Sequence, residues 1–335
     1  MLVVLSLLAL VACGSDAAKQ SVGPDPSPAP TTIPGNQAWI DVAVANMWAA
    51  PDQVRPLDAP SLAKPVDMDA WLASMSTEDR LWLVGRLVTQ ALYGDPVTIV
   101  ESAGDWTRVV APRQPSSLDP RGYPGWLPTA QLTATPPATG TGATAVVTRP
   151  ASTLRDLDDP EQTVMELSFN TRLPVLASDP TGVTVATPNG GRGRLARTDV
   201  SIDDTPPTAT GEEVVRTAQQ FAGVAYLWGG TSGPAWDCSG LTSAVYAVHG
   251  VVIPRDADDQ AAAGSPVDKD DLRPGDLLFY ATGPDRESIH HVGIYVGEGR
   301  MIQAPATGRT VETVPIDRPG LASEFWGARR YLQSG

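Results

Sequence analysis

The sequence predicts an α+β protein in which a domain of mixed helices and strands follows two small all-β domains. Two stretches, residues 38–132 and 145–202, consist of short apolar segments separated by turn residues, a pattern typical of antiparallel β structure. A linker of Thr, Ala, Pro and Gly at residues 133–144 separates them. The last stretch, residues 212–332, combines a helical spacing of apolar residues with further β-like runs. A chain of 335 residues is long enough for this arrangement.

The composition limits the partners and cofactors that we expect. The formal net charge of −14 at pH 7 argues against a nucleic-acid partner. The three histidines and two cysteines do not form the spacings of metal ligands, and the sequence has no glycine-rich phosphate-binding loop. We therefore expect neither a metal nor a cofactor.

The first residues resemble an export signal. Residues 1–12 are almost entirely apolar, too few to span a bilayer but enough for the core of a signal peptide. The run ends in Leu10-Val-Ala-Cys13-Gly, which resembles the lipobox of bacterial lipoproteins, where the cysteine receives the lipid. No Lys or Arg precedes the run, which indicates a start upstream of Met1 or a poor signal. A separate alternative is an ordinary cleaved signal with an incidental Cys13, and hence a secreted protein. We expect a signal peptide at residues 1–13 and an extracytoplasmic protein anchored to the membrane by a lipid on Cys13.

Residues 14–37 are predicted to form a disordered tether. Five prolines occur here among Ser, Thr, Asp and Gly, and the segment has almost no side chains to bury. Such a tether would hold the following domains near the membrane but not on it.

The first β domain contains several strand-like segments. Apolar residues alternate over 40–44, as in a half-buried strand. Segments 96–101 and 106–110 predict a hairpin that turns at residues 102–105.

A helical pattern over Met68–Ala91 interrupts this β domain. The stretch Thr89–Val97, the triplet Gly104-Asp-Trp106 and the segment Gly122–Trp126 are similar to the bacterial SH3-like barrel found ahead of some NlpC-type γ-D-glutamyl-L-diamino-acid endopeptidases. In those relatives a helical insertion decorates the barrel. The resemblance therefore implies an SH3-like barrel at residues 38–132 with a helical insertion.

The second β domain is expected to be another barrel of the same class. Its β-like segments are residues 163–167, 173–177 and 183–186. Turn residues separate them at 178–180 and 188–191.

The thiol available for chemistry lies at a predicted helix start. If Cys13 carries a lipid, Cys238 has no disulfide partner, which is unusual in an exported protein. Asp237 is the expected N-cap, because the apolar residues that follow have the spacing of one helical face. At this position the helix dipole and the free N–H groups favour a thiolate and can hold an oxyanion. The charge of Asp237 opposes ionisation, so a base is still required.

The sequence offers three histidines as the base. His249 lies about three turns further along the same predicted helix, roughly 16 Å from Cys238, which is too far. His290 and His291 adjoin in a predicted strand, so their side chains point to opposite faces. Gly293 shares the face of His291 and would leave room for a substrate or a helix end, which favours His291.

Six motifs follow one another in the last domain. They are Tyr226-Leu-Trp-Gly-Gly, Asp237-Cys-Ser-Gly-Leu, Ile253-Pro-Arg-Asp, Leu272-Arg-Pro-Gly-Asp-Leu-Leu-Phe-Tyr, His291-Val-Gly-Ile-Tyr-Val-Gly and Met301-Ile-Gln-Ala-Pro. This set resembles the NlpC family of papain-like peptidoglycan peptidases. The resemblance implies a papain-like catalytic domain at residues 212–332, with Cys238 as the nucleophile and His291 as the base.

The third catalytic position departs from the commoner family pattern. The family most often has His where this chain has Gln303. A Gln carbonyl can accept the ring N–H of His291, which is what a neutral amide does in papain-like enzymes. The resemblance therefore implies a triad of Cys238, His291 and Gln303, in which the uncharged Gln303 stabilises the imidazolium less than a carboxylate would.

The resemblance also implies a substrate bond between γ-D-Glu and a diamino acid, near a free L-Ala terminus. Such a substrate presents one ammonium and one carboxylate. Asp237 and Asp256 are candidates for binding the ammonium, and Arg255 for binding the carboxylate or holding the loop. Tyr226 and Ser239, which belong to the motifs around the thiol, are further candidates for substrate contact.

One residue of the first barrel is a candidate for the same site. In the two-barrel relatives an aromatic residue closes the amine side of the cleft, and Tyr123 matches it; packing inside the barrel is the alternative. Those relatives carry an acidic residue just before the Thr-Gln pair, where this chain has Val88. The strict requirement for a free amine is therefore in doubt.

We conclude that the sequence predicts a cysteine endopeptidase that hydrolyses peptidoglycan stem peptides, either in the wall or after their release. Its barrels would bind wall polymer or close one end of the cleft. One alternative is a catalytically silent wall-binding lipoprotein. Another is an N-acetylmuramoyl-L-alanine amidase or an acyltransferase that uses the same Cys–His pair.

Overall fold

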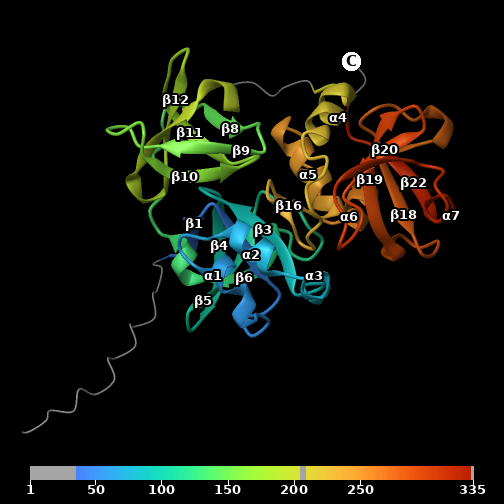
Figure 1. Ribbon diagram of the computed structural model, residues 1–335, viewed down its shortest axis with the longest axis horizontal. Helices are drawn as coiled ribbons and strands as arrows, with labels where there is room; N and C mark the ends of the chain where they lie inside the picture. The colour runs from blue at the N-terminus through green and yellow to red at the C-terminus, as the bar shows by residue number, and fades with distance from the viewer. Residues whose placement is uncertain (1–34, 204–208, 333–335) are drawn as a thin grey trace, which may run out of the picture. The chain divides into compact units, whose positions relative to one another are not determined.

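The computed structural model describes residues 35–203 and 209–332, and Figure 1 shows how their helices and strands are arranged. The predicted signal peptide, Cys13 and most of the predicted tether lie outside the described residues. Within the described ranges, no helix combines the length and the apolar character needed to cross a membrane.

The first domain is an antiparallel sheet of seven strands in the order β3-β2-β6-β5-β4-β1-β7. Its strands are β1 (Gln37–Ile40), β2 (Val44–Trp48), β3 (Leu87–Leu92), β4 (Pro96–Ala103), β5 (Trp106–Ala111), β6 (Tyr123–Pro128) and β7 (Leu132–Thr133). The predicted hairpin is present, because β4 and β5 pair around Gly104 with Ala103 opposite Trp106. The alternating residues 40–44 are divided between β1 and β2, since the chain bends at residues 41–43.

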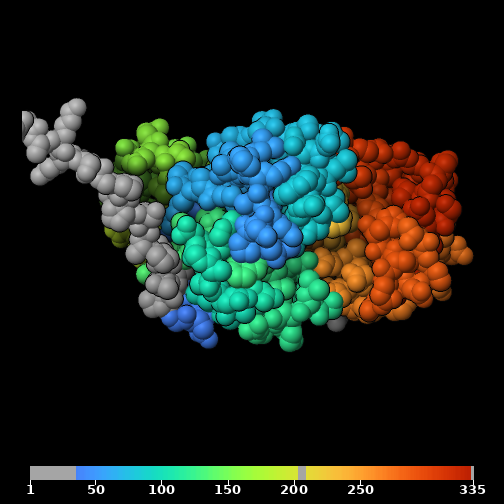
Figure 2. All heavy atoms as spheres, turned by 90° about the horizontal axis from the view of Figure 1, so that it is seen from below, coloured from blue at the N-terminus to red at the C-terminus, as the bar shows by residue number. Residues whose placement is uncertain are grey.

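The helix that we expected over Met68–Ala91 is wrong in its last part. The helical segment consists of the short helices η1 (Pro56–Asp58), α1 (Ala59–Leu62), α2 (Met68–Ser74) and α3 (Thr77–Trp82), and Figure 2 shows it in light blue on the visible surface. After α3 the chain passes Gly85, with φ of +73°, and enters β3. This strand forms because it pairs with β2 along its whole length, a non-local contact that overrides the local helical pattern.

The second domain is also an antiparallel sheet of seven strands, in the order β10-β9-β13-β12-β11-β8-β14. Its strands are β8 (Thr144–Val147), β9 (Ala151–Arg155), β10 (Thr163–Ser168), β11 (Arg172–Ser178), β12 (Gly182–Ala186), β13 (Arg192–Ala196) and β14 (Val200–Asp203). The three predicted β segments correspond to β10, β11 and β12. The predicted turn after β12 contains the short helix η3 (Pro188–Gly190), in which Asn189 adopts a positive φ of 64°.

The last domain packs helices against a six-stranded antiparallel sheet in the order β17-β22-β18-β19-β20-β21. Its helices are α4 (Gly211–Gln219), α5 (Cys238–Val248), α6 (Ala257–Ala263) and α7 (Leu321–Glu324). Its sheet contains β17 (Ser265–Val267), β18 (Leu277–Ala281), β19 (Ile289–Gly297), β20 (Arg300–Gln303), β21 (Glu312–Pro315) and β22 (Phe325–Arg330). A two-stranded hairpin, β15 (Thr231–Ser232) and β16 (Ala235–Trp236), precedes α5.

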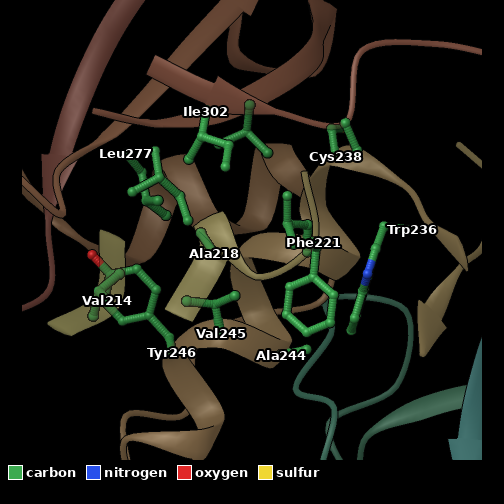
Figure 3. Packing of buried hydrophobic residues seen from close by; sticks show 14 of the residues in the cluster. Val214, Ala218, Phe221, Trp236, Cys238, Ala244, Val245, Tyr246, Leu277 and Ile302 are labelled. Carbon is green, nitrogen blue, oxygen red and sulfur yellow. The ribbon is translucent and has the colours of Figure 1, made fainter. Parts of the chain in front are cut away.

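The core of the last domain fixes the start of α5. Three aromatic side chains, Phe169, Phe221 and Trp236, meet edge to face at centroid distances of 4.8 to 6.1 Å. Phe169 follows β10, so the second domain contributes to this core. Figure 3 shows Phe221 and Trp236 side by side, with Cys238 at the edge of the same cluster. The contacts of Phe169 and Phe221 with Trp236 therefore hold the hairpin that leads to the start of α5.

Candidate active site

Cys238 is the first residue of α5, as the sequence predicts. Asp237 is the N-cap, and its Oδ1 accepts a hydrogen bond of 2.6 Å from the backbone N–H of Gly240. A larger residue than Gly240 does not fit, because a Cβ atom there would lie 2.0 Å from the carbonyl oxygen of Gly230. The Asp-Cys-Ser-Gly sequence therefore sets both the helix cap and the close approach of the preceding loop.

The environment of the Cys238 thiol disfavours its charged form. The residue is 9% exposed, and burial, followed by the charge of Asp237, raises the pKa of the thiol to about 12. The backbone N–H groups of Val292 and Ser239 lower the pKa of the thiol, but by less than burial and Asp237 raise it. Desolvation therefore outweighs the helix terminus, so the helix start alone does not produce a thiolate and a base is required.

His291 and Gln303 are neighbours on β19 and β20. The Nε2 atom of His291 and the Oε1 atom of Gln303 are 2.6 Å apart, and both side chains are buried. Because a carbonyl oxygen only accepts hydrogen bonds, Nε2 carries the proton and Nδ1 remains free to take another. Burial lowers the pKa of His291 to about 4, so its ring is neutral near pH 7.

The two other histidines, His249 and His290, contact other side chains. His249 caps the end of α5, where its Nε2 lies 2.9 Å from the hydroxyl of Thr217. His290 is the extra residue of a β-bulge between β18 and β19, which turns it towards solvent. There its Nε2 lies 3.3 Å from the carboxylate of Glu324. His291 adjoins Val292 on β19, and the backbone N–H of Val292 acts on the sulfur of Cys238.

The structure gives a different reason from the expected one for a glycine at position 293. A Cβ atom at this position would lie 2.8 Å from the sulfur of Met301 and 3.5 Å from the Cβ of Gln303. The missing side chain makes room for β20 and Gln303, not for a substrate or a helix end.

Arg255 is buried, with 2% exposure, and its guanidinium binds the groups around the thiol. Its Nη2 and Nη1 atoms lie 2.6 and 3.1 Å from the two carboxylate oxygens of Asp237, and Nη1 donates to the Ser239 hydroxyl at 2.8 Å. Its Nε donates to the hydroxyl of Thr89 at 3.0 Å. Asp237 also accepts the N–H of Gly229 at 2.9 Å. Of the two roles expected for Arg255, the structure gives it that of holding the loop.

Asp256 is a carboxylate of this region that still reaches solvent. Its side chain is 33% exposed, and its Oδ2 accepts a hydrogen bond of 3.1 Å from the Tyr123 hydroxyl. Burial raises the pKa of Asp256, and the nearby Arg255 opposes this shift. The Tyr123 ring packs in the core of the first domain, while its hydroxyl reaches Asp256 of the catalytic domain. Tyr226 is buried, and burial together with the neighbouring Cys238 raises the pKa of its hydroxyl.

The sequence did not reveal the role of Gln90, which joins the first domain to the loop before the thiol. Its buried Oε1 accepts the N–H of Thr231 at 2.9 Å and the hydroxyl of Ser232 at 2.7 Å. Its amide nitrogen donates to Asn46 at 2.8 Å, which fixes the orientation of the amide. Gln90 belongs to a motif that indicated a barrel, but nothing in the motif indicated a contact with another domain.

This arrangement supports nucleophilic catalysis by a neutral pair. We expect the thiol proton of Cys238 to pass to Nδ1 of His291 as sulfur attacks a carbonyl carbon, because burial favours the neutral forms of both groups. Gln303 holds the Nε2–H in place during this step. The imidazolium then returns the proton to the leaving amine, and water releases the acyl group from sulfur. We expect the N–H of Cys238 at the start of α5 to donate to the oxyanion, because the N–H of Gly240 is bound by the Asp237 cap.

Family models match segments of all three domains. Residues 223–330 match the NlpC/P60 family, residues 84–132 the bacterial dipeptidyl-peptidase SH3 domain, and residues 147–202 the YKFC SH3b2 domain. These matches confirm the predicted class, two SH3-like barrels before a catalytic domain.

Two relatives are similar over nearly the whole chain. A gamma-D-glutamyl-L-lysine dipeptidyl-peptidase of Bacillus cereus is 41% identical over 304 residues, which cover 89% of this chain and 91% of the relative. A protein of the same name from Bacillus subtilis is 39% identical over 290 residues, which cover 86% of this chain and 96% of the relative.

A solved structure shows the same fold. The crystal structure of an NlpC/P60 family protein from Bacillus cereus has a TM-score of 0.83 and 40% identity, covering 89% of this chain and 100% of that one. With a thiol, an imidazole and an amide on the elements described above, and with similarity that runs through all three domains, the chain belongs to the NlpC/P60 family of cysteine peptidases.

Proposed function

We propose that this peptidase cleaves the amide bond between γ-D-glutamate and an L-diamino acid in peptidoglycan stem peptides that have a free L-Ala amino group. Relatives at 39% and 41% identity are named gamma-D-glutamyl-L-lysine dipeptidyl-peptidases. The observation that carries the proposal is the hydrogen bond between Tyr123 of the first barrel and Asp256 of the catalytic domain.

This contact supports the part of our proposal in which the first barrel closes the amine side of the substrate site. Asp256 follows Arg255, which binds both Asp237 and Ser239 on either side of the nucleophile. In our proposal the first barrel blocks the substrate site beyond this point. Only a short N-terminal segment of the substrate then fits between the barrel and Cys238. The partly exposed carboxylate of Asp256 then binds the N-terminal ammonium group of the substrate.

Asp256 is a better candidate for the ammonium than Asp237. The carboxylate of Asp237 is engaged by the guanidinium of Arg255 and by the N–H groups of Gly229 and Gly240. Val88, at the position where related barrels carry an acidic residue, packs against the first domain's core and adds no charge. We therefore expect recognition of the amine to depend chiefly on Asp256.

We predict that blocking the substrate amine slows cleavage. The test compares L-Ala-γ-D-Glu-diamino-acid peptides with their N-acetylated forms, with product masses and kcat/KM as readouts. We expect cleavage after γ-D-Glu and a loss of roughly 10-fold to 100-fold for the blocked peptide, the range for losing a hydrogen bond to a charged group. Asp256→Asn should reduce cleavage of the free peptide by a similar factor and hardly affect the blocked one.

Asp258→Asn is the matched control, since it removes a carboxylate from the first turn of the same helix. Equal cleavage of the two peptides would refute the amine-binding role. Release of the whole stem peptide from muropeptides would instead identify an amidase.

We also propose that the protein is exported and held at the membrane by a lipid on Cys13. The support is the apolar run followed by the lipobox-like Leu10-Val-Ala-Cys13-Gly. The test is metabolic labelling with an alkyne fatty acid, followed by separation of membranes. We expect label and membrane association in the natural sequence and the loss of both in Cys13→Ser. An unlabelled protein found only outside the membrane fraction would refute the anchor.

A further inference from the structure

We infer that Glu312 is a positioning residue that fixes the orientation of the Gln303 amide and, through it, the tautomer of His291. The inference rests on the proposed chemistry at Cys238. Nothing in the sequence singled out Glu312, which lies outside all six motifs.

The register of two strands brings Glu312 to this place. Glu312 opens β21 directly opposite Gln303 at the end of β20. The Nε2 atom of Gln303 donates to Oε1 of Glu312 at 3.2 Å, while its Oε1 lies 2.6 Å from Nε2 of His291. The amide therefore bridges the imidazole and the carboxylate.

Such a bridge matters because an amide can face its partner in two ways. The oxygen and the NH₂ group are similar in size, and rotation about the last bond of the Gln303 side chain exchanges them. With NH₂ towards His291, the amide would donate to Nε2, and the ring proton would move to Nδ1. That nitrogen could then no longer accept the proton of Cys238. A histidine in the wrong tautomer costs roughly 10⁴-fold in the best-studied catalytic triad, that of a serine protease.

The carboxylate of Glu312 prevents this rotation. A carboxylate only accepts hydrogen bonds, so only the NH₂ end of Gln303 can face it. The carboxylate is itself held, because Arg309 lies 2.7 Å from both of its oxygens and Arg318 lies 3.4 Å from Oε1. Two guanidinium groups thus anchor the acceptor that orients the amide.

The segment that contains Arg309 and Glu312 also contacts the loop before Cys238. The carbonyl oxygen of Arg309 accepts the N–H of Tyr226 at 2.9 Å, and Thr310 pairs with Ala225. The segment that holds Glu312 is therefore attached to the chain leading to Cys238.

The histidine tautomer is measured directly by long-range ¹H–¹⁵N correlation on protein labelled with ¹⁵N-histidine, because the sequence has only three histidines. We expect the Nε2–H form of His291 in the natural protein and a substantial Nδ1–H population in Glu312→Ala. The same variant should lose roughly 10-fold to 100-fold in kcat with little change in KM, as for the loss of a hydrogen bond to a charged group.

Two further variants separate positioning from folding. Glu312→Gln keeps an acceptor opposite Gln303 and should show a smaller loss and a smaller tautomer shift than Glu312→Ala. Glu287→Ala is the matched control, since it removes an exposed carboxylate that pairs with Arg286 at 3.1 Å in the same domain. It should leave both readouts unchanged.

The inference is overturned if Glu312→Ala keeps the Nε2–H tautomer, whether its activity is unchanged or falls only with the folded fraction. If the natural protein cleaves no stem peptide, the proposed function fails, but the tautomer measurement still decides the role of Glu312. A shift of the tautomer together with the fall in kcat supports it.

Discussion

Cys238→Ala is expected to lower kcat/KM on the cleaved stem peptide by roughly 10⁴-fold or more, which is the loss seen when a catalytic nucleophile is removed. The sulfur forms the covalent bond to the substrate carbonyl, and no neighbouring group replaces it. Tyr226 and Ser239 are buried and nearby, but Ser239 accepts a hydrogen bond from Arg255 and the pKa of Tyr226 is far above the working range. The measurement is single-turnover release of the product, followed by mass.

The variant should fold as the natural protein does. Alanine fits the space of cysteine, and the cap contributed by Asp237 does not involve the thiol. Circular dichroism and the melting temperature serve as controls. A folded variant that keeps about a tenth of the activity would contradict nucleophilic catalysis at this sulfur.

Arg255→Met is expected to lower the free energy of unfolding by about 3–5 kcal/mol, the usual cost of breaking a buried ion pair by removing one partner. The guanidinium is buried against Asp237, whose carboxylate would keep its charge but lose its cationic partner, leaving only neutral donors: two backbone N–H groups and the Ser239 hydroxyl. The hydroxyls of Thr89 and Ser239 would lose a donor as well. Urea unfolding measured by fluorescence gives the free energy, and activity should fall with the loosened loop.

Two comparisons test whether charge is the cause. Adding Asp237→Asn to Arg255→Met should recover part of the lost stability, because the amide oxygen can still cap α5 without a buried charge. Arg286→Met, which breaks an exposed pair with Glu287, should change the free energy of unfolding by less than about 1 kcal/mol. Equal effects of Arg255→Met and Arg286→Met would show that the buried pair contributes no more than a surface pair.

Local sequence was sufficient to predict the helix start at Cys238, while the roles of Cys238 and His291 as nucleophile and base stay predictions. Asp237 and the apolar spacing after it predicted a capped helix start at Cys238, and the structure has it. Elimination among three histidines, aided by family motifs, pointed to His291, which meets Gln303 in the structure. These features depend on short-range patterns that the sequence displays directly.

Features that depend on tertiary environment were missed or predicted wrongly. The ionisation of Cys238 follows from burial, which no local pattern reports. The segment Leu87–Leu92 has a helical pattern but becomes a strand because β2 is available as its partner. Glu312 reaches Gln303 only through the pairing of β20 with β21, a register that sequence spacing does not specify.

The contacts of Gln90 have a consequence for how this enzyme can evolve. Its side chain provides acceptors for the N–H of Thr231 and the hydroxyl of Ser232, both inside the hydrolase. Exchanging the first barrel for an unrelated module by recombination would leave these donors buried and unpaired, at about 1–3 kcal/mol each. A new module at this place therefore needs its own acceptors for these two donors, or compensating substitutions at Thr231 and Ser232.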